Sequence, residues 1–322
     1  MVSWDKAVSI IKSSLNIALY THISSDGDAL GSTFGIALIL QSMGKDVTVF
    51  MEEPPETRLQ FLCNDKVKFV VGEPGASYVP DLSISLDCGD AGRLGKRYDS
   101  FKRAHFTINI DHHLNTEKFA DINICDSTWA ATCEAIWELS DYLGIKLDRE
   151  SAVLIYTGIL TDTGSFAYSN TTARTHYIAA QLKEILGDTS YLYRKVFEMV
   201  TPQCLKIQGR AFNKVEYFDD GRIAYICIED QDYIETGAGE SDIQSISNIL
   251  RSIKGVDTGV LVKPTLDGYK ISMRSSELCD VAAVAAIFGG GGHKRAAGFI
   301  WHGESSKLKE LLVEELAKAI VV

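Results

Sequence analysis

The chain lacks the features that define several large classes of protein. No apolar run among its 322 residues approaches the roughly 20 residues that a membrane-spanning helix needs. Its start, Met1-Val-Ser-Trp-Asp-Lys6, has neither the basic region nor the small-residue cleavage site of a signal peptide. The seven cysteines are scattered and include no Cys-x-x-Cys pair, which argues against a disulfide framework and a structural zinc site. We therefore expect a protein of the reducing cytoplasm.

The chain is also short of positive charge. Its 43 Asp and Glu residues outnumber 32 Lys and Arg residues, and the formal net charge is −11. Binding of long duplex nucleic acid depends on Lys and Arg that neutralise phosphates, so this balance argues against such a partner. Clustered carboxylates bind divalent cations, and those cations in turn bind phosphate. The acidic balance therefore favours short or small phosphorylated substrates.

The first part of the chain alternates strand-like and helix-like segments. Apolar runs predict strands at residues 17–21, 47–51, 82–86 and 106–110. Apolar residues at helical spacing predict helices at residues 29–43, 129–143, 150–160 and 172–186. This alternation indicates βαβ units, and hence an α/β domain at residues 1–187 with a mostly parallel sheet and helices on both faces.

The pattern changes after residue 187. Residues 188–213 are predicted to form a helical connector, and residues 214–322 a smaller α/β domain. Two hairpins and three helical stretches are expected in that domain: strands 214–218 with 223–228, strands 256–262 with 269–273, and helices at 242–253, 279–287 and 305–319. Two domains suit this length, because single cores seldom grow beyond roughly 250–300 residues. We expect the domains to face each other across a cleft.

Histidines and aspartates follow two of the predicted strands. Residues 111–113 (Asp-His-His) come directly after strand 106–110, and residues 22–28 (His-x-x-x-Asp-x-Asp) begin where strand 17–21 ends. In open α/β sheets, ligands bind outside the carboxyl ends of the strands. Carboxylates and imidazoles gathered at that edge predict a metal-dependent hydrolase.

The first of these segments holds three candidate ligands. Its spacing lets His22 and Asp26 converge on one ion while Asp28 points to a second. The alternative is a polar turn in which Asp28 caps the following helix. This short pattern leaves both interpretations open.

Single acids extend the same pattern. Asp87 follows strand 82–86, where its carboxylate could bridge two ions by giving one oxygen to each; the alternative is an Asx turn. For Asp90 we favour that turn or a supporting role.

Asp162 ends an apolar helical pattern, and an acid there needs a partner such as a cation. Capping of the next segment is the competing explanation for Asp162.

The Asp-His-His segment is the most specific signal. Adjacent histidines project their rings in different directions, so one of His112 and His113 can bind metal while the other faces substrate. Asp111 can orient an imidazole by hydrogen bonding. Two ordinary histidines in a turn are the alternative.

The C-terminal part contains a second candidate site. Four consecutive glycines, Gly289–Gly292, would let backbone N–H groups approach an anion, and three basic residues follow them. An arginine at the end of a predicted strand is suited to bidentate phosphate contact. A tight structural loop is the alternative to phosphate binding. The candidate substrate-binding residues are Arg274, Ser275, Gly290, Gly291, Gly292, His293, Lys294 and Arg295.

Together these motifs resemble the DHH phosphoesterase superfamily, in the subgroup whose C-terminal domain is called DHHA1. The resemblance spans nearly the whole chain and is greatest to bacterial nano-RNases that also dephosphorylate 3′-phosphoadenosine 5′-phosphate (pAp). It implies an enzyme that hydrolyses short oligonucleotides to mononucleotides and removes the 3′-phosphate of pAp to give AMP. It further implies a water activated by two divalent metal ions, typically manganese.

The resemblance also implies roles for individual residues. Two sets of side chains would hold the two ions: His22, Asp26 and Asp87 for one, and Asp28, Asp87, His112 and Asp162 for the other. Asp111 matches the family's orienting acid, and His113 matches the histidine directed at the substrate phosphate. Arg274 and His293 match substrate-binding positions of the second domain. No metal-ligand position departs from the family pattern.

Three other functions stay open. A cyclic di-adenylate phosphodiesterase uses the same superfamily site. A RecJ-type processive exonuclease is less favoured, because the chain lacks the extra nucleic-acid-binding domain and basic surface that long strands need. A metal- or nucleotide-binding sensor without turnover is disfavoured by the intact ligand set. The sequence does not fix the natural substrate, the cleavage polarity, the metal or the oligomeric state, and a homodimer stays open.

Overall fold

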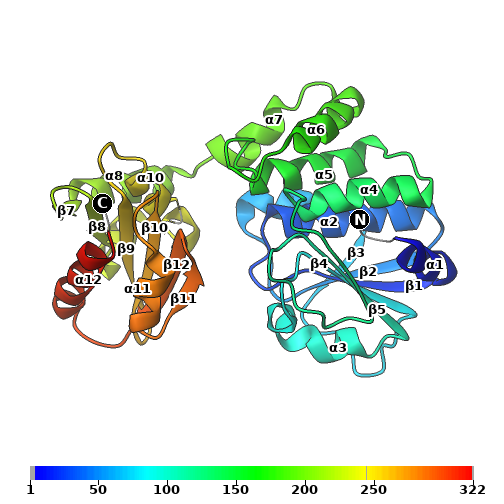
Figure 1. Cartoon of the computed structure of the whole chain (residues 1–322), viewed down its shortest axis with the longest axis horizontal. Helices are drawn as coiled ribbons and strands as arrows, with labels where there is room; N and C mark the ends of the chain where they lie inside the picture. The colour runs from blue at the N-terminus through cyan, green and yellow to red at the C-terminus, as the bar shows by residue number, and fades with distance from the viewer. Residues whose placement is uncertain (1–3, 244, 321–322) are drawn as a thin grey trace. The chain divides into compact units, whose positions relative to one another are not determined.

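The structure is a computed structural model that describes residues 4–243 and 245–320. It consists of two compact units, Met1–Met199 and Val200–Val322, each with its own six-stranded sheet (Figure 1). The division between the units lies within the segment 188–213 that the sequence predicts as a helical connector. An α/β chain with a parallel N-terminal sheet and a smaller C-terminal α/β part is therefore confirmed.

The sheet of the first unit is entirely parallel and has the order β3-β2-β1-β4-β5-β6. Its strands are β1 Asn16–Tyr20, β2 Asp46–Met51, β3 Lys68–Val71, β4 Leu82–Leu86, β5 Phe106–Asp111 and β6 Ile122–Cys125. The chain runs outward from β1 to β3 and then returns to place β4 on the other side of β1. The strand order therefore reverses between β1 and β4, which is the position where α/β sheets bind ligands.

Helices cover both faces of this sheet, as predicted. In Figure 1, α2, α4 and α5 lie on one side of the strands and α3 on the other. The helical segments of the first unit are α1 Asp5–Ser13, α2 Gly27–Ser42, η1 Thr57–Leu62, η2 Ala91–Arg97, α3 Tyr98–Lys102, α4 Thr132–Leu143, α5 Arg149–Asp162, α6 Ala173–Leu186, α7 Ser190–Tyr193 and η3 Arg194–Glu198. The predicted helices at 29–43, 129–143, 150–160 and 172–186 correspond to α2, α4, α5 and α6.

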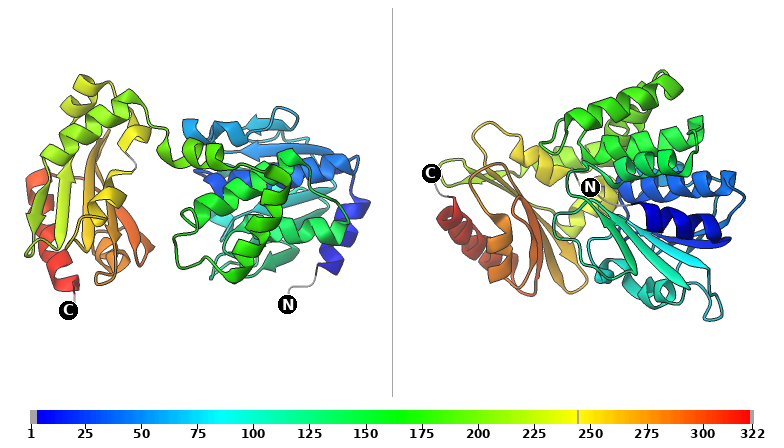
Figure 2. Two further views of the ribbon diagram at one scale, coloured as in Figure 1. Left: turned by 90° about the horizontal axis from the view of Figure 1, so that it is seen from above. Right: turned by 45° about the vertical axis from the view of Figure 1, so that its right-hand side comes forward.

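The side chains of β1 show why the strand is buried on both sides. Ile17 and Leu19 belong to the large core that includes α2 and α5. The alternating residues Ala18 and Tyr20 belong to a second cluster, which includes Phe101 of α3. Because successive side chains of a strand point to opposite faces, each set packs against a different helical layer. Figure 2 shows helices on both sides of the strands of the first unit. A strand in this position has to be apolar throughout.

The second unit contains a mixed sheet with the order β11-β12-β10-β9-β8-β7. Its strands are β7 Glu216–Phe218, β8 Ile223–Cys227, β9 Thr258–Thr265, β10 Gly268–Ser275, β11 Gly291–His293 and β12 Ala296–Trp301. Only β8 and β9 pair in parallel among these strands of the described residues; the other neighbours are antiparallel. Its helical segments are α8 Pro202–Asn213, α9 Asp230–Thr236, η4 Glu240–Ile243, α10 Ile246–Arg251, α11 Val281–Ile287 and α12 Ser305–Ala319.

Both predicted hairpins are present, with one correction. The first turns through Asp219, Asp220 and Gly221, all with positive φ. The second is tighter than the sequence suggests, because Pro264 and Thr265 belong to β9 and only two residues separate it from β10. Antiparallel pairing of these two strands extends to the last residue of β9. The turn is therefore shorter than the segment 263–268 that the predicted strands leave between them.

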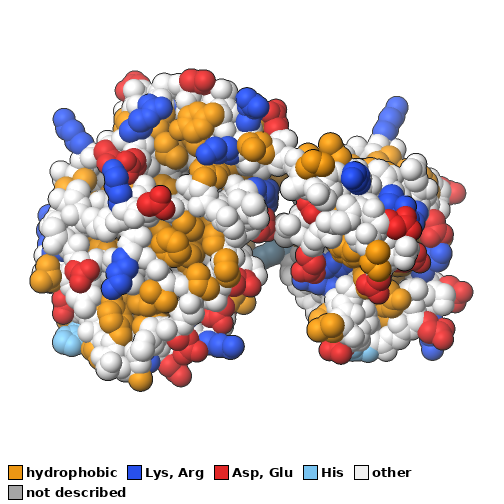
Figure 3. Space-filling view, turned by 180° about the vertical axis from the view of Figure 1, so that it is seen from behind, with side chains coloured by type: hydrophobic (Ala, Val, Ile, Leu, Met, Phe, Trp, Pro, Cys, Tyr) orange, Lys and Arg blue, Asp and Glu red, His pale blue; other side chains and the backbone are white. Residues whose placement is uncertain are grey.

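Charged side chains of both signs are interspersed on the face shown in Figure 3, where Lys and Arg do not merge into a continuous patch. This agrees with the acidic composition of the chain, −11 overall. No helix of the described residues has the length and apolar character required to cross a membrane.

Candidate metal centre

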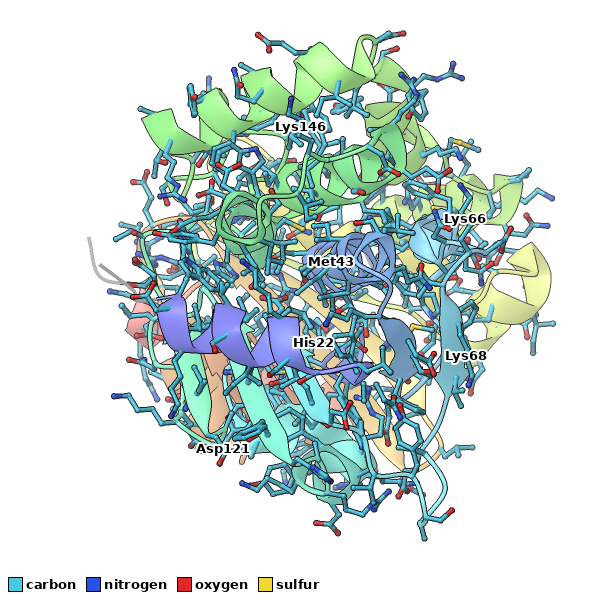
Figure 4. All side chains as sticks on the ribbon, turned by 90° about the vertical axis from the view of Figure 1, so that its right-hand side faces the viewer. His22, Met43, Lys66, Lys68, Asp121 and Lys146 are labelled. Carbon is cyan, nitrogen blue, oxygen red and sulfur yellow. The ribbon has the colours of Figure 1, made fainter. Side chains whose placement is uncertain are left out.

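Three neighbouring strands, β1, β4 and β5, end at the candidate site. His22 lies two residues after β1, Asp87 directly follows β4, and Asp111 is the last residue of β5, followed by His112 and His113. His22 is buried in the interior of the first unit (Figure 4). Asp87 has a positive φ of 62°. A non-glycine residue in that conformation is strained, which is common where a side chain is held for a function.

The start of α2 supplies two more acids. Asp26 caps the helix, and its Oδ1 accepts hydrogen bonds from the backbone N–H groups of Asp28 and Ala29 at 3.0 Å. The alternative in which Asp28 caps this helix is therefore wrong. Asp28 is fully buried in the first turn, where its carboxylate accepts from the N–H groups of Thr132 at 2.6 Å and Cys133 at 3.0 Å. The start of α4 thus binds Asp28 as helix N-termini bind anions.

Asp162 is the last residue of α5. The amide of Asn170 donates to the backbone oxygen of Asp162 at 3.1 Å and to that of Ala130 at 3.0 Å, which ties the end of α5 to the segment before α4. The next helix, α6, is capped by Thr172. The alternative in which Asp162 caps the following segment is therefore wrong.

These elements bring all six predicted metal ligands together. His22 Nε2 lies 3.8 Å from Asp26 Oδ1 and 3.5 Å from Asp87 Oδ2. His112 Nε2 lies 3.4 Å from Asp87 Oδ1 and 3.6 Å from Asp162 Oδ2. The two oxygens of Asp87 therefore face two different imidazoles. Among the described residues, three groups could hold a metal ion: His22 with Asp26 and Asp87, Asp28 with His112 and Asp162, and Asp87 with His112 and His113.

The acids of the cluster are costly to ionise together. Burial raises the pKa of Asp28 well above its ordinary value, and the charges of Asp87 and Asp162 raise it further. Burial also raises the pKa of Asp162, and the charges of Asp87 and Asp26 act in the same direction, so that it reaches about 8. A divalent cation would favour the ionised forms and remove this cost. The donor set therefore fits a bound cation.

The histidines respond to the same acids in the opposite direction. Burial lowers the pKa of His22, but hydrogen bonds and charge from Asp26 and Asp87 outweigh burial and raise it to about 10. Burial would raise the pKa of Asp26, yet the interaction with the imidazole of His22, 3.8 Å away, lowers it to about 2. The raised pKa of His22 and the lowered pKa of Asp26 thus both follow from the close approach of their side chains.

Asp111 takes a different part from the other acids. It is fully buried and belongs to none of the three groups of the described residues. Its Oδ1 lies 2.7 Å from His113 Nδ1, and its Oδ2 accepts from the hydroxyl of Thr116. The hydrogen bond with Asp111 raises the pKa of His113 to about 9. Asp111 thereby fixes a half-exposed imidazole at the edge of the cluster.

Three supporting residues escape sequence reasoning. The hydroxyl of Thr132 donates to Asp87 Oδ1 at 2.9 Å, while its N–H binds Asp28, so one residue holds two acids. Thr116 holds Asp111. Arg97 is fully buried and donates to the carbonyl oxygens of residue 50, the penultimate residue of β2, and residue 21, which directly follows β1. The partners of Thr132 and Arg97 are remote in sequence, so no local pattern links them. Thr116 lies only five residues from Asp111, but nothing in that short segment marks the contact.

The predicted substrate-binding residues lie in the second unit around β12. Arg274 of β10 and His293 of β11 both pair with Ala296 of β12, on its two sides. Residues in register across a sheet share a face, so the two side chains emerge on the same side. Arg295 donates from Nη1 to the oxygen of Cys279 at 2.9 Å. Ser275 is fully buried, its hydroxyl donating to that same oxygen at 2.7 Å, and Lys294 is exposed.

The glycine run is not simply a loop. Its second half forms the edge strand β11, which pairs with β12. A Cβ at Gly290 would lie 2.3 Å from a carbonyl oxygen of β12, and one at Gly292 would lie 2.5 Å from another. Gly289 and Gly292 also have positive φ. A Cβ at Gly291 would meet nothing within 4 Å, so three glycines are required by the fold and Gly291 is not.

Family profiles match both units. The profile described as the DHH family, N-terminal domain, matches residues 16–159, and the DHHA1 domain profile matches residues 220–321. The chain belongs to the DHH family. It is 31% identical to the uncharacterized protein MG371 of Mycoplasma genitalium over 313 residues, which covers 94% of this chain and 92% of the relative.

Curated DHH-family relatives with named activities align over most of this chain. The protein of Thermus thermophilus named bifunctional oligoribonuclease and PAP phosphatase NrnA is 29% identical over 310 residues, or 94% of this chain and 91% of that protein. The protein of the same name from Bacillus subtilis is 29% identical and aligns over 88% of each chain.

Solved structures with the DHH fold are also similar. An exopolyphosphatase-related protein from Bacteroides fragilis superposes with a TM-score of 0.90 at 26% identity, covering 98% of this chain and 96% of that one. Exonuclease RecJ bound to manganese superposes with a TM-score of 0.54 at 16% identity, covering 99% and 95%. The second likeness shows a shared fold.

Proposed function

We propose that this DHH-family chain is a metal-dependent phosphoesterase that hydrolyses short oligonucleotides to mononucleotides and removes the 3′-phosphate of pAp to give AMP. The observation that carries the proposal is the placement of Asp87, whose two oxygens face His22 and His112 from the end of a central strand. That arrangement is what two adjacent ions would require. The relatives named bifunctional oligoribonuclease and PAP phosphatase, which align over about nine-tenths of the chain, support this substrate class.

We assign the metal ligands as two sets that share Asp87: His22, Asp26 and Asp87, and Asp28, Asp87, His112 and Asp162. Two divalent ions bound there would supply an activated water and neutralise charge on the phosphoryl oxygens. Imidazoles among carboxylates suit a borderline ion such as Mn²⁺. Mg²⁺ prefers well-hydrated sites made of oxygen ligands.

The chain's own residues then bind and orient the substrate. Asp111 fixes the ring of His113 through Nδ1, which leaves Nε2 to donate to a phosphoryl oxygen at the edge of the cluster. Thr132 holds Asp28 and Asp87 in their mutual positions, so the ligands do not have to rearrange when ions bind. In the second unit, we assign contact with the rest of the substrate to Arg274 and His293, with Gly291 and Lys294 beside them.

These roles divide the chain as its sequence suggests. We assign catalysis to residues 1–187, a connecting role to residues 188–213, and substrate binding to residues 214–322. The seven cysteines are all unpaired in the structure, which supports the reducing cytoplasm as the site of action.

A panel of substrates tests the proposal directly. The metal-stripped chain, reloaded with Mn²⁺, should release mononucleotides from di- to pentanucleotides and phosphate from pAp. Mg²⁺ should restore less activity than Mn²⁺. Zn²⁺ should also restore less activity than Mn²⁺, because it favours four ligands. Preferential cleavage of cyclic di-adenylate would instead assign the chain as a cyclic dinucleotide phosphodiesterase. No turnover of any substrate with Mn²⁺ would contradict the proposal.

A further inference from the structure

Arg93 of η2 lies against the metal centre, although the two sets of proposed ligands do not include it. Its Nη2 is 3.0 Å from Nδ1 of His22. The backbone of Arg93 is fixed on both sides, because its N–H donates to Asp90 Oδ1 at 3.0 Å and its oxygen accepts from the N–H of Ile23 at 2.8 Å. The segment that carries the guanidinium is thus tied to the turn that carries His22.

Nδ1 of His22 has a second neighbour, the backbone oxygen of Ile23 at 2.6 Å. A carbonyl oxygen can only accept a hydrogen bond, and a guanidinium can only donate one. Nδ1 either carries a proton or offers a lone pair, so it can satisfy Ile23 or Arg93 but not both. The two contacts exclude each other.

An ion at the centre decides between them. Nε2 of His22 is the atom that faces Asp26 and Asp87, at 3.8 and 3.5 Å. An ion bound there would take the lone pair of Nε2 and leave the ring proton on Nδ1. That proton would be donated to the oxygen of Ile23, which is how ligating histidines are usually held. Nη2 of Arg93 would then face an N–H group, which cannot accept its hydrogen bond.

The two acids that follow β2 have partners of their own. Glu52 is held by Nε of Arg97 at 3.1 Å, and Glu53 accepts from the N–H of Ser24 at 2.8 Å. Among the described residues Arg93 forms no ion pair within 4 Å, although it lies beside an acidic cluster. A half-buried guanidinium in that position is available to an incoming anion.

We propose that Arg93 binds a phosphoryl oxygen of the substrate next to the ion held by His22, Asp26 and Asp87. The inference rests on the proposed function and adds a phosphate contact in the first unit to those assigned to the second. A guanidinium stays charged at all working pH values and presents several donors in one plane, which suits phosphate. It would also offset the repulsion between an anionic substrate and the remaining carboxylates.

The test compares charge and length at one position. Arg93→Met removes the charge and keeps most of the apolar stem of the side chain, and Arg93→Lys keeps the charge. Lys96→Met removes a charge from an exposed position of the same segment and serves as the control. Binding of inorganic phosphate to each Mn²⁺-loaded protein is measured by titration calorimetry, and bound manganese by elemental analysis.

We expect Arg93→Met to weaken phosphate binding by roughly tenfold or more with manganese content unchanged, Arg93→Lys to weaken it less, and Lys96→Met to leave it nearly unchanged. Equal phosphate affinity in Arg93→Met and the unaltered chain would overturn the proposal. So would loss of manganese, since Arg93 would then act on His22, and so would an equal effect of Lys96→Met. The proposed function fails separately, if the unaltered chain binds phosphate but hydrolyses no phosphoester.

Discussion

Arg274 and His293 are register partners of the same residue, Ala296, on opposite sides of β12. Two strand spacings separate them by about 10 Å, and their side chains emerge on the same face of the sheet. A phosphate or base edge lying across β12 could therefore contact both. The relationship explains how Arg274 at a strand end and His293 after the glycine run, 19 residues apart in sequence, can contribute to one binding surface.

Arg274→Ala should raise KM for dinucleotides and pAp by roughly tenfold, because it removes a charge-assisted contact with the substrate. Cleavage of a generic chromogenic phosphodiester, which can use little of the second unit, should change far less. Lys270→Ala is the matched control, since Lys270 is exposed on the same strand and face. Unaltered kcat/KM for both natural substrates in Arg274→Ala would remove the second unit from substrate binding.

Alanine at two neighbouring glycines should separate folding from binding. Gly292→Ala forces a Cβ to within 2.5 Å of a carbonyl oxygen at a positive φ, so it should lower the thermal unfolding midpoint. Gly291→Ala should leave the midpoint unchanged, because its Cβ would meet no protein atom within 4 Å. If Gly291→Ala nevertheless raises KM, a ligand approaches the backbone there. An unchanged KM would make the glycine run purely structural.

Asp87→Ala should abolish turnover and lower bound manganese more than the loss of any acid that faces a single imidazole. The reason is that its two oxygens face His22 and His112, so both ions would lose a ligand. Elemental analysis compares it with Asp26→Ala. His113→Ala should keep its manganese and lose most activity, because Nδ1 of His113 is already bound to Asp111 and we assign its ring to the substrate phosphate. Full manganese content in Asp87→Ala would refute the bridging assignment.

Thr132→Val should weaken manganese binding without unfolding the chain. It removes the hydroxyl that donates to Asp87 at 2.9 Å and keeps the N–H that binds Asp28. Loss of one such hydrogen bond costs about 1 kcal/mol, or several-fold in the manganese concentration needed for half-maximal activity. Thr132→Ser should restore the wild-type value. A change in the unfolding midpoint of the metal-stripped chain, with no change in manganese dependence, would instead assign Thr132 to stability alone.

The metal centre could be located from sequence because each ligand sits directly after a strand or at a helix end. Parallel pairing brings such positions to one edge of the sheet, so Asp87 and His112 could be placed together without knowing any contact. Thr132 could not be found this way, since its partner Asp87 is 45 residues away and no local pattern marks the pair. The same holds for Arg93, whose contact with His22 depends on how η2 folds back.

Two strands of the first sheet were missed for a related reason. Both strands are only four residues long. The apolar run of β3, Phe69–Val71, is short and exposed, and Asn123 interrupts the apolar residues of β6, so neither resembles a buried core strand. In the second unit, the composition of the glycine run indicated conformational freedom but not that β11 would pair with β12. Strand pairing depends on a partner strand, which lies outside the short stretch of sequence that is examined for a local pattern.

Helix α2 is buried at every position from Gly27 to Leu40, and a Cβ at Gly31 would lie 2.6 Å from a carbonyl oxygen of α5. A helix packed this closely cannot open locally without disrupting the whole unit. Its amide hydrogens should accordingly exchange with solvent only through global unfolding. Asp26 and Asp28 lie at the start of this helix, so they lose their conformational entropy when the chain folds, before any ion binds. Ions would then meet a preorganised centre, and their affinity would be gained without further ordering of the chain.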